Sequence, residues 1–212
     1  MKRPRTHSLA VLTALLAAAF LLRVVGLGDV PLRGDEAFAV RYWADAPATV
    51  VRDLAHWEPH PLGTFLSFWA WKSTAGSSEF AMRALSLLGG WLGMAATGAL
   101  ARTLLRSRRA APVALALAAL HPFLIWHAQD ARNYALWFGA SSLAMWLFLR
   151  AAARNRRSDW VLYLIAETVA LYFFFLEAFL LVVQAAYLVA QRRPRRVVTA
   201  ALRVWLVLGI LL

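Results

Sequence analysis

Long apolar runs separated by short arginine clusters constrain this sequence more than any other feature. A helix needs about 20 mostly apolar residues to cross a hydrocarbon core of roughly 30 Å. The runs that approach this length are residues 8–27, 84–105, 110–127, 134–149, 160–190 and 197–212. The chain is 61% hydrophobic and only 16% charged, whereas an ordinary soluble domain is about half apolar and a quarter charged. The sequence therefore predicts an integral, multi-pass membrane protein.

The net charge of +12 is a topological signal rather than a sign of nucleic-acid binding. A nucleic-acid-binding face gathers basic residues among polar neighbours, but here they cluster between apolar runs. Fifteen of the 23 basic residues fall in four clusters, namely Lys2/Arg3/Arg5, Arg102/Arg106/Arg108/Arg109, Arg150/Arg154/Arg156/Arg157 and Arg192/Arg193/Arg195/Arg196. Basic loops of membrane proteins face the cytoplasm. We therefore expect these clusters and the N-terminus on the cytoplasmic side of the plasma (inner) membrane, and no nucleic-acid partner.

The clusters also set the number of crossings, because an even number must separate neighbouring clusters. As one helix, residues 160–190 would be about 46 Å long, so we predict a hairpin that turns near residues 174–177. Residues 62–71 are predicted to form an interfacial or re-entrant outer helix instead of a span. The expected fold is an all-α transmembrane bundle, a single module over residues 1–212. It has six complete spans, the start of a seventh, and interfacial helices in a large outer loop, residues 28–82.

Acidic residues concentrate in the segments predicted to lie outside. Asp35 and Glu36 begin a predicted helix over residues 35–44, with Phe38 among the residues of its aromatic face. A carboxylate at the junction of a loop and a helix can act as a general base or bind a cation. The alternative is structural, because acidic residues in a first turn complement the helix dipole.

A second polar group lies where the third predicted span ends and the fourth begins. Asp130, Arg132 and Tyr134 occur together there, and a polar turn beside an interfacial aromatic belt is the alternative explanation. Lys72 and Arg83 flank the end of the outer loop. With Arg132 they can form a cationic pocket for a lipid phosphate, since arginine pairs well with phosphate oxygens. Taken singly, each is also explained as an interfacial cation.

Two carboxylates fall within the predicted hairpin, Glu167 near mid-span and Glu177 near the tip. Ionisable residues within a membrane are costly and are functional candidates by default. A protonated or hydrogen-bonded structural role explains Glu167 equally well, and solvation explains Glu177. A rival interpretation is a non-catalytic carrier-lipid flippase or transporter component, with Glu167 and Arg132 along its pathway. A membrane assembly subunit is a further alternative.

The order of four short motifs resembles a known family. The motifs are GDEA at 34–37, HPLGTFLSFWAWK at 60–72, SEFAMRALSLLGG at 78–90 and HPFLIWHAQDARNYAL at 121–136. Together they resemble the membrane-embedded glycosyltransferases of GT-C fold, in the group of protein O-mannosyltransferases, lipid A aminoarabinose transferases and RgtA-to-RgtD-like enzymes. The resemblance extends over nearly the whole chain, from residue 21 to residue 190.

This resemblance implies inverting transfer of a sugar from a polyprenyl-phosphate donor to an acceptor on the outer face. The acceptor is a lipid, a glycan or a protein, and membrane lipids surround the enzyme. Asp35 would be the base that deprotonates the acceptor, and Glu36 and Asp130 would orient the acceptor or a cation. The residues expected to bind the substrate or its phosphate are Lys72, Arg132, His60, Tyr134 and Arg83.

The match to the family pattern has departures. Asp130 stands where Glu is commoner, and Phe173 to Phe175 with Glu177 stand where the family often has a His-Tyr pair. Two acidic groups can share one divalent cation, but no ligand set is complete, so we predict no cofactor and no tightly bound catalytic metal. Family members are longer, so we expect a truncated chain that holds the catalytic half.

Overall fold

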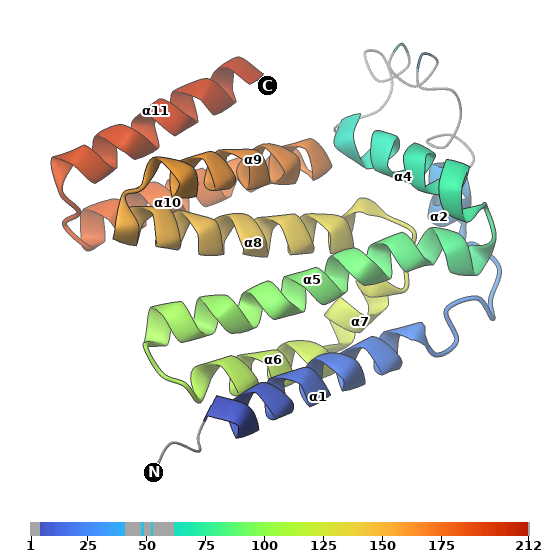
Figure 1. Cartoon of the computed structure of the whole chain (residues 1–212). Helices are drawn as coiled ribbons and strands as arrows, with labels where there is room; N and C mark the ends of the chain where they lie inside the picture. The colour runs from blue at the N-terminus through green and yellow to red at the C-terminus, as the bar shows by residue number, and fades with distance from the viewer. Residues whose placement is uncertain (1–4, 41–47, 49–51, 53–61, 212) are drawn as a thin grey trace.

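The regular structure is entirely helical in the part of the chain that the computed structural model describes, residues 5–40, 48, 52 and 62–211 (Figure 1). The helices are α1 (Arg5–Val24), α2 (Gly34–Phe38), α4 (Leu62–Ala75), α5 (Glu79–Leu105), α6 (Ala110–Leu120), α7 (Pro122–Ala128), α8 (Asn133–Arg154), α9 (Arg157–Phe173), the 3-10 turn η2 (Phe175–Glu177), α10 (Ala178–Ala190) and α11 (Arg195–Leu211). The prediction of an all-α fold is confirmed.

Helices α5 and α8 form the centre of the bundle, with α1 and α6 beyond α5 and with α9 beside α8 (Figure 1). Two glycines allow the close approach of α5 and α8. A Cβ atom at Gly139 would lie 2.4 Å from the main-chain oxygen of Gly89, closer than any real contact. Small residues at helix crossings are a common device in membrane proteins, because they let two backbones pack directly.

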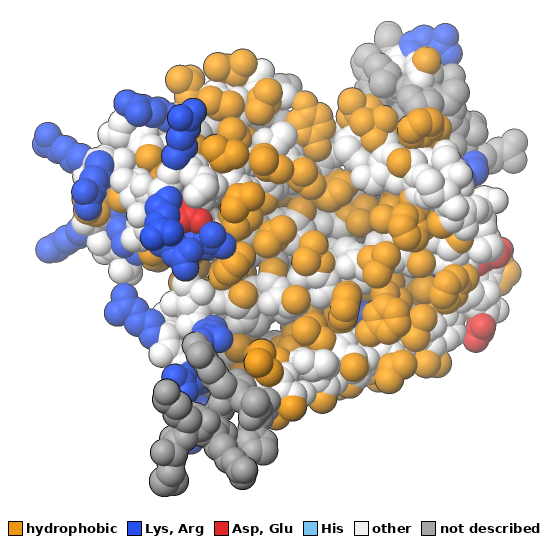
Figure 2. All heavy atoms as spheres, in the orientation of Figure 1, with side chains coloured by type: hydrophobic (Ala, Val, Ile, Leu, Met, Phe, Trp, Pro, Cys, Tyr) orange, Lys and Arg blue, Asp and Glu red, His pale blue; other side chains and the backbone are white. Residues whose placement is uncertain are grey.

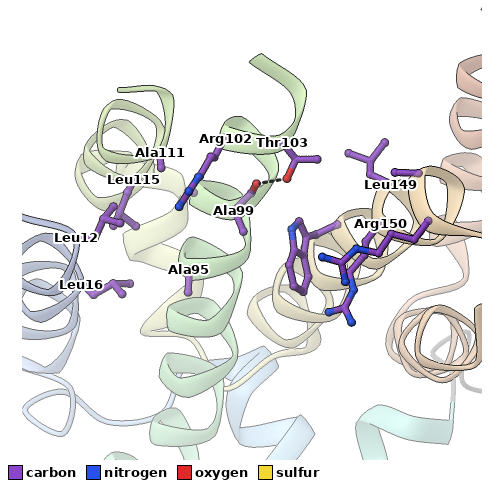
Figure 3. Close-up of a pocket in the computed structure, with 14 residues that line it drawn as sticks. Leu12, Leu16, Ala95, Ala99, Arg102, Thr103, Ala111, Leu115, Leu149 and Arg150 are labelled. Atoms are coloured by element: carbon purple, nitrogen blue, oxygen red, sulfur yellow. Dashed lines mark hydrogen bonds between the residues drawn. The ribbon is translucent and has the colours of Figure 1, made fainter. Parts of the chain in front are cut away.

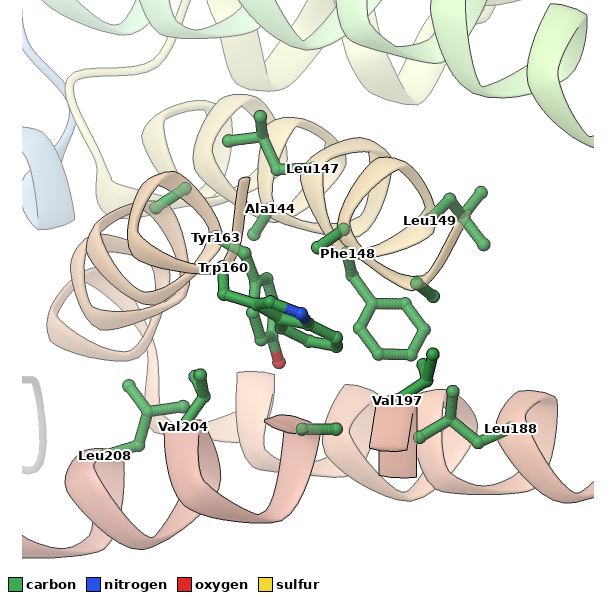
Figure 4. Packing of buried hydrophobic residues seen from close by; sticks show 14 of the residues in the cluster. Ala144, Leu147, Phe148, Leu149, Trp160, Tyr163, Leu188, Val197, Val204 and Leu208 are labelled. Carbon is green, nitrogen blue, oxygen red and sulfur yellow. The ribbon is translucent and has the colours of Figure 1, made fainter. Parts of the chain in front are cut away.

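The C-terminal half packs around a cluster of aromatic and aliphatic side chains from α8, α9, α10 and α11 (Figure 4). The ring of Tyr163 lies 5.5 Å from that of Phe148 and 6.0 Å from that of Trp160, between centroids. Val204 and Leu208 of α11 complete the cluster. In a membrane, such close van der Waals packing is a main force that holds helices together. The hydrophobic effect contributes little there, because lipid tails are as apolar as the side chains.

Two helices, α5 and α8, have the length and apolar composition of a membrane span. Helices α6 and α7 make a third if the pair, which is bent by 66°, is one span. The bend falls at His121, whose backbone is extended because the ring of Pro122 disfavours a helical conformation in the preceding residue. The described residues thus support two to three spans, and the six-span arrangement is not confirmed.

Two finer expectations match the local structure. Residues 160–190 form two helices, α9 and α10, joined through η2 at the place predicted for a turn. Residues 62–71 lie within α4, which is helical as predicted, while its interfacial location stays a prediction.

Charged side chains gather at opposite ends of the bundle (Figure 2). Arginine side chains cover the end where α5 meets α6, α8 meets α9 and α10 meets α11, and acidic groups appear at the other end, beyond a mostly hydrophobic middle. Asp159 is an exception at the basic end, where its Oδ1 lies 2.7 Å from Nε of Arg150. The three arginine clusters that lie within the described residues, at 102–109, 150–157 and 192–196, therefore come together in space.

Candidate active site

A buried ion pair fixes the start of α2 against α5. Arg83 donates from Nε to Oε1 of Glu36 at 2.8 Å and from Nη2 to Oε2 at 2.7 Å. The same carboxylate accepts main-chain N–H groups from Ala131 at 2.9 Å and from Arg33 at 3.0 Å. Both charged side chains are almost fully buried. Two parallel bonds between a guanidinium and a carboxylate are among the strongest polar contacts in proteins.

The remaining donors of Arg83 hold the segment before α2. Its Nη1 donates to the main-chain oxygens of Leu27 and Val30, and its Nη2 donates to that of Pro31. The hydrogen-bonding groups of Glu36 and Arg83 are thus engaged within the protein. This geometry favours a positioning role for both residues over the predicted contacts of Glu36 with the acceptor and of Arg83 with phosphate.

The surroundings of Glu36 keep its carboxyl group charged. Burial raises its pKa, but the hydrogen bonds from Arg83, Arg33 and Ala131 lower it by more, so the pKa lies below the ordinary value for glutamate. A charged Glu36 secures Arg83 and joins three segments that are distant in the sequence: the turn before α2, the start of α5 and the turn before α8.

Asp35 lies next to this pair and points outward. Its side chain is 86% exposed, because neighbouring residues on a helix face different directions and Glu36 faces the interior. Nη1 of Arg132 lies 3.5 Å from Oδ2 of Asp35 and donates to the Asp35 main-chain oxygen at 3.3 Å. An accessible carboxylate is therefore held beside a guanidinium.

Asp130 lies in the turn between α7 and α8, on the chain segment that Ala131 connects to Glu36. Its Oδ2 is 3.9 Å from Nδ1 of His127. Burial and the negative charge of Glu36 raise the pKa of Asp130 to about 6, although Arg132 and other nearby arginines act in the opposite direction. The structure thus brings the two acidic motifs of the sequence to one place.

An aromatic cavity of about 230 Å³ opens beside this turn. Tyr134, in the first turn of α8, has its ring centre 4.7 Å from that of His127, with the two rings tilted, and 6.0 Å from that of Phe174, in a T-shaped arrangement. Arg132 lies over the Tyr134 ring at 5.9 Å. Trp137 lines the cavity and donates from its indole N–H to the Glu177 carboxylate.

Helix α4 packs near α2, since Phe65 and Phe68 share a buried cluster with Ala39. Lys72 is half-buried in its last turn and forms no ion pair with another described residue. His60 lies outside the residues that the structure describes.

A comparison with protein families identifies the chain. Residues 59–212, more than half of the sequence, match the family model of dolichyl-phosphate-mannose-protein mannosyltransferases. The chain belongs to this family. These proteins are membrane glycosyltransferases of GT-C type, so the resemblance predicted from the motifs is confirmed. No curated protein and no solved structure matches the chain significantly.

The segment that matches the mannosyltransferase family model contains only part of the candidate site. Five of the predicted residues that the structure describes, Lys72, Arg83, Asp130, Arg132 and Tyr134, lie within the matched segment. Asp35 and Glu36 precede its first residue. Their assignment in this chain therefore depends on the contacts of α2 with Arg83, Arg132 and Ala131 rather than on the family match.

Several residues at this site were not predicted from the sequence. Arg33 places its guanidinium 4.4 Å from the ring centre of Trp126, and Trp137 joins the cavity to Glu177. In the sequence, the only indication that Arg33 belongs to the site is its position directly before the GDEA motif, and this indication is weak. Trp126, its partner, is 93 positions away, and no pattern near either residue indicates that the two side chains meet.

Metal binding has no structural support in the part of the chain described. No group of three or more His, Asp or Glu side chains there is placed to hold an ion. The expectation that the chain needs no tightly bound metal or cofactor stays a prediction.

Proposed function

We propose that this membrane glycosyltransferase moves a sugar from a polyprenyl-phosphate donor to a lipid, glycan or protein acceptor on the outer face of the plasma (inner) membrane. The reaction inverts the anomeric carbon. The observation that carries the proposal is the exposed Asp35 carboxylate beside Arg132, held in place by the buried Glu36–Arg83 pair. A base and a cation within reach of one another meet the main requirements of this transfer.

Asp35 is the proposed base. It accepts the proton of the acceptor hydroxyl or amine while the acceptor oxygen or nitrogen attacks the anomeric carbon from the face opposite the phosphate. The bond from that carbon to the phosphate oxygen breaks, and its electron pair leaves with the polyprenyl phosphate. Because a phosphate leaves readily when cations offset its charge, no general acid is needed. Arg132 and Lys72 are the proposed cations.

Asp130 and Tyr134 have supporting roles in this proposal. Ionised Asp130 accepts a hydrogen bond from the acceptor or attracts a cation. Tyr134 and the neighbouring ring of His127 offer an apolar wall to the sugar or the first prenyl units. The prediction that His60 contacts the substrate is retained as part of the proposal.

The contacts of the membrane-embedded polar groups give less support to a flippase. Glu167 accepts from Nε2 of Gln184 at 3.1 Å, and Oε1 of Gln184 accepts from the Tyr163 hydroxyl. That hydroxyl in turn accepts from the indole of Trp205 at 2.9 Å. Glu167, Gln184 and Tyr163 are fully buried, and Trp205 is half-buried, in the packing of α9, α10 and α11, as in a structural network. A transport route would need accessible charges across the bilayer.

The test is a transfer assay with the purified full-length protein in lipid nanodiscs. Radiolabelled polyprenyl-phosphate sugars are supplied together with a membrane extract as the source of acceptors. Appearance of label on an acceptor supports the proposal. In proteoliposomes, movement of labelled donor across the bilayer without transfer to an acceptor would instead support the flippase.

The pH dependence of the transfer tests the role of Asp130. Because its pKa is raised to about 6, its carboxylate is mostly protonated below that pH, and we expect kcat/KM to fall as the pH decreases through about 6. The Asp130→Asn variant should be slower and should lack this step in its pH profile. A variant that keeps the step would assign it to another group.

The raised pKa of Asp130 also makes the free energy of unfolding depend on pH. Asp130 in the folded protein retains its proton up to about pH 6, whereas in the unfolded chain it loses the proton near pH 4. Its contribution to the free energy of unfolding therefore decreases as the pH rises from about 4 to about 6. Asp130→Asn should remove this decrease in thermal unfolding experiments.

A further inference from the structure

An open groove lies at the arginine-rich end of the bundle, away from the candidate active site. It has a volume of about 620 Å³ and runs between α1, α5, α6 and α8 (Figure 3). Its walls are apolar, with Leu12 and Leu16 from α1, Ala95 and Ala99 from α5, Leu115 from α6 and Trp146 from α8. This volume is in the range of roughly 300–1,000 Å³ that is common for ligand sites.

Three arginines also line the groove, namely Arg102 from α5 and both Arg150 and Arg154 from α8. Arg150 is engaged, with its Nε 2.7 Å from Asp159 Oδ1. Arg102 and Arg154 are exposed and form no ion pair with other described residues. Two guanidinium groups that pair with no carboxylate in the described part of the chain thus lie at the edge of an apolar groove, where an anion would be attracted.

The charged and apolar groups are ordered along the groove. On α5, Ala95, Ala99 and Arg102 share one face, and the first and last are seven positions apart, about 10 Å along the helix axis. On α8, Trp146 precedes Arg150 and Arg154 in the same order. Cations therefore lie at the end of the bundle and apolar walls lie deeper. An amphiphile with an anionic head and a hydrocarbon tail has the same arrangement.

We propose that this groove binds an acidic glycerophospholipid. The phosphate lies between Arg102 and Arg154, and an acyl chain follows the apolar wall formed by Ala95, Ala99 and Leu16. Basic pockets between membrane helices select such head groups, because each cation near the membrane surface favours an anionic lipid. The site is independent of the transferase chemistry, since it shares no residue with the candidate active site.

Native mass spectrometry of the full-length protein tests the proposal. The purified protein is titrated with phosphatidylglycerol, with phosphatidylcholine of the same acyl chains, and with glycerol phosphate. We expect the first phosphatidylglycerol to bind more tightly than the other two. The double variant Arg102→Gln/Arg154→Gln should weaken that binding by about 25-fold, or about fivefold for each arginine. Ala99→Trp should weaken it by filling the apolar wall.

Matched controls separate the groove from general effects. Arg108→Gln/Arg156→Gln removes the same charge from exposed positions at the same end that do not line the groove, and Ala186→Trp adds an indole on the exposed side of α10. Both should bind phosphatidylglycerol like the wild type. Equal losses in the control and groove variants, equal binding of the two lipids, or glycerol phosphate binding as tightly as phosphatidylglycerol would overturn the proposal.

Discussion

The Asp35→Asn variant is expected to lose sugar transfer by about 10²–10⁴-fold in kcat, the range typical for removal of a general base. Asparagine has nearly the same shape as aspartate but cannot take up the proton that the hydroxyl or amine of the acceptor substrate releases. KM for the donor should change little, since Arg132 and Lys72 remain. The transfer assay in nanodiscs, run at saturating donor, measures the effect.

The fold should tolerate this change, because the Asp35 side chain is 86% exposed. Thermal unfolding of Asp35→Asn is therefore expected to match that of the wild type. Asp29→Asn is the matched control, as it removes an exposed carboxylate from the segment just before α2 and should keep full activity. Wild-type transfer by Asp35→Asn would show that another group is the base.

The Arg83→Met variant is expected to lower the free energy of unfolding by about 3–5 kcal/mol, the usual cost of removing one partner from a buried ion pair. Methionine fills much of the volume but leaves the Glu36 carboxylate buried without its guanidinium. It also removes the donors to Leu27, Val30 and Pro31. Chemical unfolding in detergent measures the difference.

The pH dependence of this effect has a defined direction. The pKa of Glu36 is lowered in the folded protein, so its stabilising contribution is present above about pH 4.3, the unfolded value, and is lost as the pH falls through the folded pKa. The wild type should therefore lose stability in acid, and Arg83→Met should lose less. The difference between their stabilities should therefore narrow at low pH, and the part caused by the lost hydrogen bonds to Leu27, Val30 and Pro31 should remain.

Arg109→Met is the control for this variant. It removes an exposed arginine at the opposite end of the bundle, and such surface changes usually stay within about 0.5 kcal/mol. Arg83→Lys retains the charge but not the two parallel bonds, so an intermediate stability is expected. If Arg83→Met were as stable as Arg109→Met, the ion pair would not hold α2 in place.

Local patterns in the sequence were sufficient to locate most of the helices. Apolar runs and basic clusters located helices such as α5 and α8, and the interruption near Phe174 located the turn between α9 and α10. The motifs at Asp35 and Asp130 can be recognised from composition alone, because clustered polar residues beside apolar runs stand out. The family resemblance followed from the order of these motifs.

Local patterns in the sequence were insufficient to predict which of two adjacent acidic residues is buried and which is exposed. Asp35 and Glu36 are neighbours of the same chemical type, yet Glu36 is buried and Asp35 is exposed. The difference arises because Arg83, 47 residues away, and the Ala131 main chain meet only one of them. The six predicted spans are not confirmed, because composition does not show where a helix shorter than a full span ends, and residues 110–127 counted as one run although the chain bends by 66° at His121.

The sequence by itself determined that this chain is a helical membrane protein, that its charges divide between two ends, and that it resembles GT-C glycosyltransferases. These properties depend on composition and short-range order, which need no contacts between distant residues. The tertiary structure alone decided which carboxylate is accessible, which arginines are engaged and where an open groove remains. Those outcomes depend on which helix faces meet, and only the packing of the whole chain fixes that.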